Sequence, residues 1–195
     1  MVGIILAGGC STRAKVNKLL LEVDRKPLIR HTIDSIKNFV DEVFVVTGKY
    51  HEELLPYLTD VTVVYNKNYN DGMSTSVYAG IIAANAENCL ILPADITCVK
   101  PSTIKEIVNA KGEIRVPAFN GVRGHPLYLS SKYAQEFLNH GPQFRLCDLV
   151  NNNKDIVSDV NVNDPYINFD IDTLDDYDKL VKCISEDNKR KELTL

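Results

Sequence analysis

The sequence has neither a cysteine framework nor a metal-binding cysteine pattern. Its five cysteines are odd in number and widely spaced, and no two of them form a C-x-x-C pair. These features argue against both a disulfide scaffold and a zinc cage. Unpaired cysteines favour a reducing compartment, so we expect a cytoplasmic protein.

Long hydrophobic runs and an excess of positive charge are also missing. Nowhere do about 18 apolar residues follow one another, and the first apolar run lacks the flanks of a signal peptide. Lys and Arg number 22 against 26 Asp and Glu, which gives a net charge of -4. We therefore expect neither a membrane nor a nucleic acid as partner, and any anion site must be a local cluster.

Short apolar runs rich in β-branched residues recur along the chain and predict strands. They cover residues 2–6, 42–48, 61–65, 88–95, 113–119 and 125–130. Between them, helical periodicity appears at Leu28–Phe39, Val77–Ile82 and Ile104–Val108. The alternation predicts an α/β fold, a three-layer α/β/α sandwich around a Rossmann-like, mostly parallel sheet. With 195 residues, 45% of them hydrophobic, we expect a single domain over residues 1–195 with a polar tail at about residues 186–195.

The chemically unusual residues follow predicted strands. Gly8 and Gly9 come after the first strand, Asp95 after the fourth, and Gly124–Pro126 stands at a later strand boundary. In sheets of this kind ligands gather beyond the carboxyl ends of the strands. We therefore expect these residues to surround one site.

The stretch LAGGCSTRAKVNK, Leu6–Lys18, has the features of an anion-binding loop. Adjacent glycines let backbone N–H groups surround an anion without interference from Cβ atoms. Arg13 and Lys18 would add the charge that a polyphosphate needs. On spacing alone, a glycine-rich turn with solvated cations is an equal alternative. The stretch matches neither GxGxxG nor GxxxxGK[ST], which speaks against the usual dinucleotide and Walker-type loops.

The same stretch resembles the LAGGxSxRMGxxK signature of the MobA-like nucleotidyltransferases, with Ala14-Lys15 in place of Met-Gly. In that family the loop wraps the triphosphate of a bound NTP, and the fold is of the nucleotide-diphospho-sugar transferase type. The resemblance implies that Arg13 and Lys18 neutralise phosphates. The implied nucleotide-binding residues here are Leu6, Ala7, Gly8, Gly9, Ser11, Arg13 and Lys18.

Further motifs follow in the order of that family. The segments VVTGKYHEEL, YNKNYNDGMSTSVYAGI, LPADIT, RGHPLYLS and DIDTLDDY resemble its VVTG, N-x(5)-GMxxSVxxGI, acidic-loop, RG[HN]P and DIDTPEDY motifs. By this resemblance Gly72 and Ser76 also bind the nucleotide. The implied substrate-binding residues are Gly124, His125 and Pro126, together with Arg145 in GPQFRLCDLV, which resembles a GxxGxRxLL segment.

Two aspartates are candidate ligands for Mg²⁺ or Mn²⁺. Asp95 ends an apolar strand, and Mg²⁺ beside a polyphosphate takes one or two carboxylates with phosphate oxygens and water. A loop carboxylate that accepts hydrogen bonds from nearby N–H groups is the alternative. Asp172 is a candidate second ligand, a candidate N-cap of a helix with acids in its first turn, or both, since a cap can lie next to a metal. The resemblance implies Arg13, Lys18 and Asp95 as the catalytic residues.

The GMSTSV, GHP and DIDT segments are most similar to the molybdenum cofactor cytidylyltransferases, which join CTP to molybdopterin. The expected reaction is attack of an acceptor phosphate on the α-phosphorus of an NTP, with pyrophosphate leaving. A phosphate monoester is already largely ionised, so no general base is needed. A molybdopterin guanylyltransferase and a sugar-phosphate nucleotidyltransferase are the alternatives within this class. A non-catalytic accessory protein that delivers cofactor to a molybdoenzyme client, a molybdenum hydroxylase, is the alternative outside it.

The anion-loop hypothesis predicts the effect of Arg13→Ala. Loss of the guanidinium should weaken NTP binding and leave the fold unchanged, because the side chain is expected to contact phosphates only. Calorimetric titration with an NTP and Mg²⁺, with circular dichroism as the check on folding, measures both. Unaltered NTP affinity would mean that the stretch is only a turn.

Overall fold

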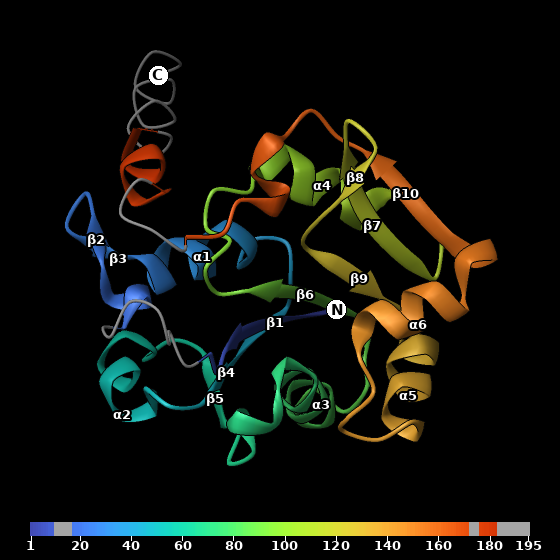
Figure 1. The fold of residues 1–195 in the computed structure, drawn as a ribbon, viewed down its shortest axis with the longest axis horizontal. Helices are drawn as coiled ribbons and strands as arrows, with labels where there is room; N and C mark the ends of the chain where they lie inside the picture. Colours follow the sequence, from blue (N-terminus) through green and yellow to red (C-terminus); the bar gives the residue numbers. More distant parts are fainter. Residues whose placement is uncertain (10–16, 172–175, 183–195) are drawn as a thin grey trace.

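The fold is built around a twisted sheet with helices on both faces (Figure 1). The computed structural model describes residues 1–9, 17–171 and 176–182. The strands of the sheet are β1 (Val2–Ala7), β4 (Glu42–Thr47), β5 (Thr62–Tyr65), β6 (Cys89–Pro93), β7 (Ile114–Phe119), β8 (Val122–Arg123), β9 (Leu127–Leu129) and β10 (Val157–Asn161). Their order is β10-β7-β9-β6-β1-β4-β5, with β8 paired to β7. Neighbouring strands are parallel except at β9 and β8.

The helices form the two outer layers. They are α1 (Leu28–Ile36), α2 (His51–Leu54), α3 (Met73–Ala83), α4 (Pro101–Asn109), α5 (Ser131–Asn139) and α6 (Leu146–Asn152), and residues 176–182 are also helical. Figure 1 shows α1 and α4 on one side of the sheet and α3, α5 and α6 on the other. None of the described helices is both long enough and apolar enough to cross a lipid bilayer.

Short 3-10 helices and one hairpin complete the described chain. The 3-10 turns are η1 (Lys18–Leu20), η2 (Leu55–Tyr57), η3 (Tyr69–Asp71), η4 (Lys154–Ile156) and η5 (Pro165–Asn168), and the hairpin pairs β2 (Glu22–Val23) with β3 (Lys26–Pro27).

Two hydrophobic cores lie on opposite faces of the sheet. Ile4 packs in the core under α3 and α5, and its neighbour Ile5 packs in the core under α1 and α4. Successive side chains of a strand point to opposite faces, so an apolar run such as VGIILA must be covered on both sides. The helix α3 comes especially close, because a Cβ added at Gly80 would lie 2.5 Å from Ile4 Cγ2.

The predicted α/β/α sandwich is confirmed. Each of the six predicted runs contains a strand, and each of the three helical patterns overlaps a helix. Ile82, which belongs to one of those patterns, is nonetheless 53% exposed. The strands β2, β3, β8 and β10 were not predicted. The first three have only two residues each, and the sequence of β10, VSDVN, is half polar and only partly buried at the sheet edge. The expected polar tail at about residues 186–195 lies outside the described residues.

One buried carboxylate, Asp164, anchors the start of α4. Its Oδ2 accepts hydrogen bonds from Lys100 N (2.8 Å) and from the Thr103 hydroxyl (2.8 Å), and its Oδ1 accepts one from Tyr166 N (3.0 Å). Asp164 is 0% exposed, so these three donors replace the hydrogen bonds that water would give to its carboxyl group. Asp164 therefore joins the loop after β6 to the segment around η5.

The prediction from this contact is that Asp164→Ala destabilises the fold. Three donors would be left without their acceptor, which should lower the free energy of unfolding by about 2–4 kcal/mol. Urea denaturation followed by circular dichroism measures the change. Asp159→Ala is the control, because Asp159 pairs with Arg123 at 2.6 Å while 45% exposed and should cost less than about 1 kcal/mol. Equal costs for the two variants would contradict the anchoring role.

Candidate nucleotide site at the carboxyl edge

The ends of β1, β4 and β6 meet at the carboxyl edge of the sheet. Pairing places Ala7 beside Thr47 and Leu6 beside Pro93. One more hydrogen bond, from Ala94 N to Leu6 O (3.0 Å), continues the β1–β6 pairing past the last strand residue. Gly8 follows β1 and Asp95 follows Ala94, so these two residues come next on the two neighbouring chain segments and lie side by side at this edge. This edge lies where the chain order reverses around β1, the usual ligand position in open α/β sheets.

Gly8 and Gly9 have different surroundings: a side chain would clash at Gly8 and would not clash at Gly9. A Cβ added at Gly8 would lie 2.6 Å from Ser76 Oγ, and one added at Gly48 would lie 2.6 Å from Gly8 O. Gly8 is thus held between α3 and the end of β4. A Cβ added at Gly9 would meet no atom of the described residues within 4 Å, and Gly9 is exposed. The open space in front of the turn is therefore at Gly9.

The hydroxyl of Ser76 is fixed from behind by Asn66. The side-chain amide of Asn66 donates to Ser76 Oγ (3.0 Å) and to Thr75 Oγ1 (2.9 Å), and its oxygen accepts from Asn68 N (3.0 Å). Ser76 is buried, so it supports the glycine turn from below. Gly72, the N-cap of α3, is exposed with φ of +111°, a backbone conformation that favours glycine.

Lys18 and Asp95 form an ion pair at this edge. Lys18 Nζ lies 2.8 Å from Asp95 Oδ2 and donates a hydrogen bond to the carbonyl oxygen of Ile171 (2.9 Å). The side chains of Lys18 and Asp95 are 17% and 26% exposed. The lysine therefore joins the start of η1, the loop after β6 and the segment after η5 at a partly screened position.

His125 approaches the same carboxylate from the loop before β9. Its backbone N donates to Ile167 O (2.8 Å), and its buried Nδ1 has no hydrogen-bond partner among the described residues. Burial lowers the pKa of the imidazole below its ordinary value, although the negative charge of Asp95 and a hydrogen bond with the backbone of Ile91 act in the opposite direction. At neutral pH the ring is therefore uncharged. Gly124 is required by packing, because a Cβ there would lie 2.5 Å from Ile167 O.

Arg145 does not contact Lys18, Asp95 or His125 among the described residues. It is exposed at the start of α6 and donates to both carboxylate oxygens of Asp148, at 2.8 and 2.7 Å. Among the described residues, no hydrogen bond or ion pair links Arg145 to Lys18 or Asp95. The predicted residues Ser11, Arg13 and Asp172 lie outside the described residues, and their roles stay predictions.

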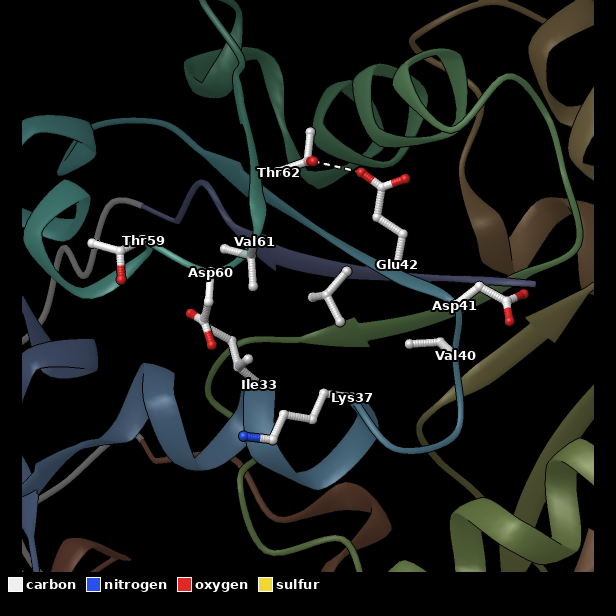
Figure 2. A pocket seen from close by; sticks show the side chains of 10 residues that line it. Ile33, Lys37, Val40, Asp41, Glu42, Thr59, Asp60, Val61 and Thr62 are labelled. Carbon is white, nitrogen blue, oxygen red and sulfur yellow. Dashed lines mark hydrogen bonds between the residues drawn. The ribbon is translucent and has the colours of Figure 1, made fainter.

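A surface hollow of about 420 Å³ lies at the opposite, amino-terminal edge of β4 and β5. Figure 2 shows Lys37 from α1 facing it, with Asp41, Glu42 and Thr62 from the strand starts. Its charged groups already have partners: Lys37 Nζ lies 2.5 Å from Asp34 Oδ1, and Glu42 accepts a 2.5 Å hydrogen bond from Thr62. The hollow lacks the glycine turn, so we place the candidate site at the carboxyl edge.

Comparison with known proteins decides the family. A model of the MobA-like NTP transferase domain matches residues 3–156. The chain belongs to the MobA-like NTP transferase family. It is a nucleotidyltransferase.

Curated relatives of this family have two related names. The molybdenum cofactor cytidylyltransferase of Escherichia coli strain K12 is 27% identical over 65% of this chain and 68% of its own length. A probable molybdenum cofactor guanylyltransferase of Thermococcus sibiricus is 31% identical over 71% of each chain.

Solved structures support the MobA-like fold. A nucleotidyl transferase from Methanothermobacter thermautotroptrophicus superposes with a TM-score of 0.80 at 24% identity, over 93% of this chain and 95% of that one. Rv0371c of Mycobacterium tuberculosis, in a complex with manganese, gives a TM-score of 0.76 at 22% identity, over 93% and 97%.

The MobA-like site also contains residues that sequence reasoning did not assign. Thr32 donates from α1 to Ala94 O (2.8 Å) and so holds the loop that carries Asp95. Asn66 holds Ser76, and the carbonyl of Ile171 holds Lys18. Thr32 lies on an apolar helix face and Ile171 acts through its backbone, so neither gives a side-chain signal. Asn66 is the first residue of the N-x(5)-GM motif, and this motif position is the sequence signal that could have identified it.

The packing of the MobA-like turn predicts that one alanine substitution destabilises the protein and that another, close by, does not. Gly48→Ala places a methyl group 2.6 Å from Gly8 O and 2.7 Å from Tyr69 Cβ, so the turn must shift. We expect a loss of about 1–3 kcal/mol in the free energy of unfolding. Gly9→Ala is the matched control and should change stability by less than about 0.5 kcal/mol, because its methyl group meets open space. Urea midpoints measure both, and a similar midpoint for the two variants would refute the packing argument.

Proposed function

We propose that this chain transfers a cytidine monophosphate group from CTP to the terminal phosphate of molybdopterin, with release of pyrophosphate. The observation that carries the proposal is the Lys18–Asp95 pair beside the Gly8–Gly9 turn. A flexible cation, a carboxylate and an open backbone turn are the groups that nucleotidyl transfer requires. The relative from Escherichia coli, named for the cytidylyl reaction, supports the choice of base and acceptor.

In this mechanism the phosphates lie in front of Gly9, where an added Cβ would meet no atom of the described residues within 4 Å. Lys18 and Arg13 neutralise charge on the β- and γ-phosphates. An oxygen of the acceptor phosphate attacks the α-phosphorus, the new P–O bond forms, and the bond to pyrophosphate breaks. The protein contributes position and charge rather than covalent chemistry. No residue has to remove a proton, because the acceptor phosphate is already ionised.

The residues at the edge fit a divalent cation, Mg²⁺ or Mn²⁺. Two hard oxygens, Asp95 Oδ2 and Ile171 O, already hold the ammonium of Lys18 at 2.8 and 2.9 Å, so this position accepts positive charge. Among the described residues no group of three His, Cys, Asp or Glu side chains could hold a metal ion. Asp95, with Asp172 as second ligand, would therefore need phosphate oxygens and water to complete the shell. When bound, the cation supplies charge stabilisation at the phosphates. The manganese complex of Rv0371c supports this assignment.

We assign the acceptor to the loop before β9. His125 supports this, since its Nδ1 has no hydrogen-bond partner among the described residues and can accept a hydrogen bond from a substrate group when the ring is uncharged. Gly124 and Pro126 hold the loop in place. Arg145, which pairs with Asp148 at the exposed start of α6, is left out of this assignment. A molybdoenzyme would be the client for the product.

GTP in place of CTP is the second candidate. It is supported by the guanylyltransferase name of the Thermococcus sibiricus relative, which is 31% identical, against 27% for the cytidylyltransferase. The base is expected to meet backbone groups of the turn, whose hydrogen-bonding capacity does not depend on side-chain identity.

The test measures pyrophosphate release from CTP, GTP, ATP and UTP in the presence of molybdopterin and Mg²⁺. We expect release with CTP, and a fall of about 100-fold or more in Asp95→Asn, since an electrostatic group at the reacting phosphates is lost. Asp41→Asn is the matched control, because Asp41 pairs with the terminal amine of Met1 at the opposite edge. Turnover of Asp95→Asn near that of the control would contradict the role of Asp95. Release with GTP alone would overturn the cytidylyl assignment.

A further inference from the structure

Among the described residues, the ammonium of Lys18 contacts two oxygens. Its Nζ lies 2.8 Å from Asp95 Oδ2 and 2.9 Å from Ile171 O, and neither side chain of the ion pair is more than 26% exposed. Both partners come from other parts of the chain, 77 and 153 positions away along the sequence. The contact is therefore a specific tertiary arrangement rather than a local surface pair.

This arrangement conflicts with the roles of the same residues during the reaction. The proposed function, on which this inference rests, requires Asp95 to hold a divalent cation and Lys18 to neutralise phosphate. An ammonium 2.8 Å from Asp95 Oδ2 occupies the oxygen that the metal would use. A metal ion bound there would also face a positive charge at close range, and the two charges repel.

We propose that Lys18 is the resident cation of the metal position and that the incoming metal–nucleotide complex displaces it. The lysine then transfers its charge from Asp95 to the phosphates, which its four-carbon stem and rotatable ammonium allow. Metal alone would place a second positive charge beside the ammonium without supplying phosphates for it to neutralise, so displacement by metal alone is unfavourable. The protein therefore binds the metal and nucleotide together rather than the metal first.

The surroundings of Asp95 fit this exchange. The loop is held by Ala94 from two sides, since its N–H donates to Leu6 O (3.0 Å) and its carbonyl accepts from Thr32 (2.8 Å). Asp95 is thus kept in place whichever cation it holds. A partly buried carboxylate without a cation would lower the stability of the protein. The ammonium of Lys18 avoids this loss as long as no metal–nucleotide complex is bound.

The experiment measures binding of Mn²⁺ alone, by the electron paramagnetic resonance signal of the free ion, and binding of Mn²⁺ with CTP or GTP by calorimetry. In Lys18→Met we expect Mn²⁺ alone to bind about tenfold more tightly than in the native protein, a coupling of usual size between neighbouring sites. The same variant should bind the Mn²⁺–nucleotide complex more weakly. A purely structural role of Lys18 would not change these two affinities in opposite directions.

Three variants control the result. Lys37→Met removes one positive charge at the opposite edge, where Lys37 pairs with Asp34, and should leave the Mn²⁺ affinity unchanged. Lys18→Arg keeps the charge and should keep Mn²⁺ binding weak. Adding Asp95→Asn to Lys18→Met should abolish the gain. If Lys18→Met does not fold, Lys18→Gln, which keeps a donor and loses the charge, replaces it.

The proposal is overturned if Lys18→Met and Lys18→Gln bind Mn²⁺ no more tightly than the native protein, or if the gain survives Asp95→Asn. Its failure differs from failure of the proposed function. In the first case the native protein still releases pyrophosphate from its nucleotide while the Mn²⁺ affinities stay equal. In the second, pyrophosphate release is absent and the Mn²⁺ pattern of the variants is still seen.

Discussion

The close approach of Gly8 to Ser76 and Gly48 is the constraint on which the carboxyl edge depends. A side chain at position 8 would meet Ser76 Oγ at 2.6 Å, so the turn after β1 can pack here only as glycine. Asn66 fixes Ser76 from below, and the pairing of β1 with β4 and β6 fixes the turn from both sides. The exposed backbone at Gly9 is therefore supported by a rigid base, as a site that must hold phosphates in one geometry requires.

Charge at the same edge is organised more flexibly than packing. Lys18 reaches Asp95 and Ile171 through a long side chain, whereas Gly8 is held by backbone and buried hydroxyl. A nucleotidyltransferase needs both properties, because the phosphates must be positioned precisely while the cations around them change partners. The neutral ring of His125 adds a group that does not compete for either charge.

The strands, the three-layer order and the position of Asp95 could be predicted because each leaves a periodic or contiguous pattern in the sequence. Thr32, Asn66 and Asp164 could not, since buried polar residues bond to backbone groups or hydroxyls brought near by the fold, without a fixed spacing. The strand β10 was missed because an edge strand needs little apolar surface. Arg13 and Asp172 lie outside the described residues, so their roles rest on the sequence.

The segment after η4 makes the functional unit longer than the stretch of family similarity. The family match ends at residue 156. Beyond it, β10 covers the edge of β7, Asp164 anchors α4, Ile167 binds the loop of His125, and Ile171 holds Lys18. A boundary drawn from sequence similarity would separate the site from its own supports. For this chain, the region of common ancestry ends at residue 156, whereas the region that supports the site extends at least to Ile171.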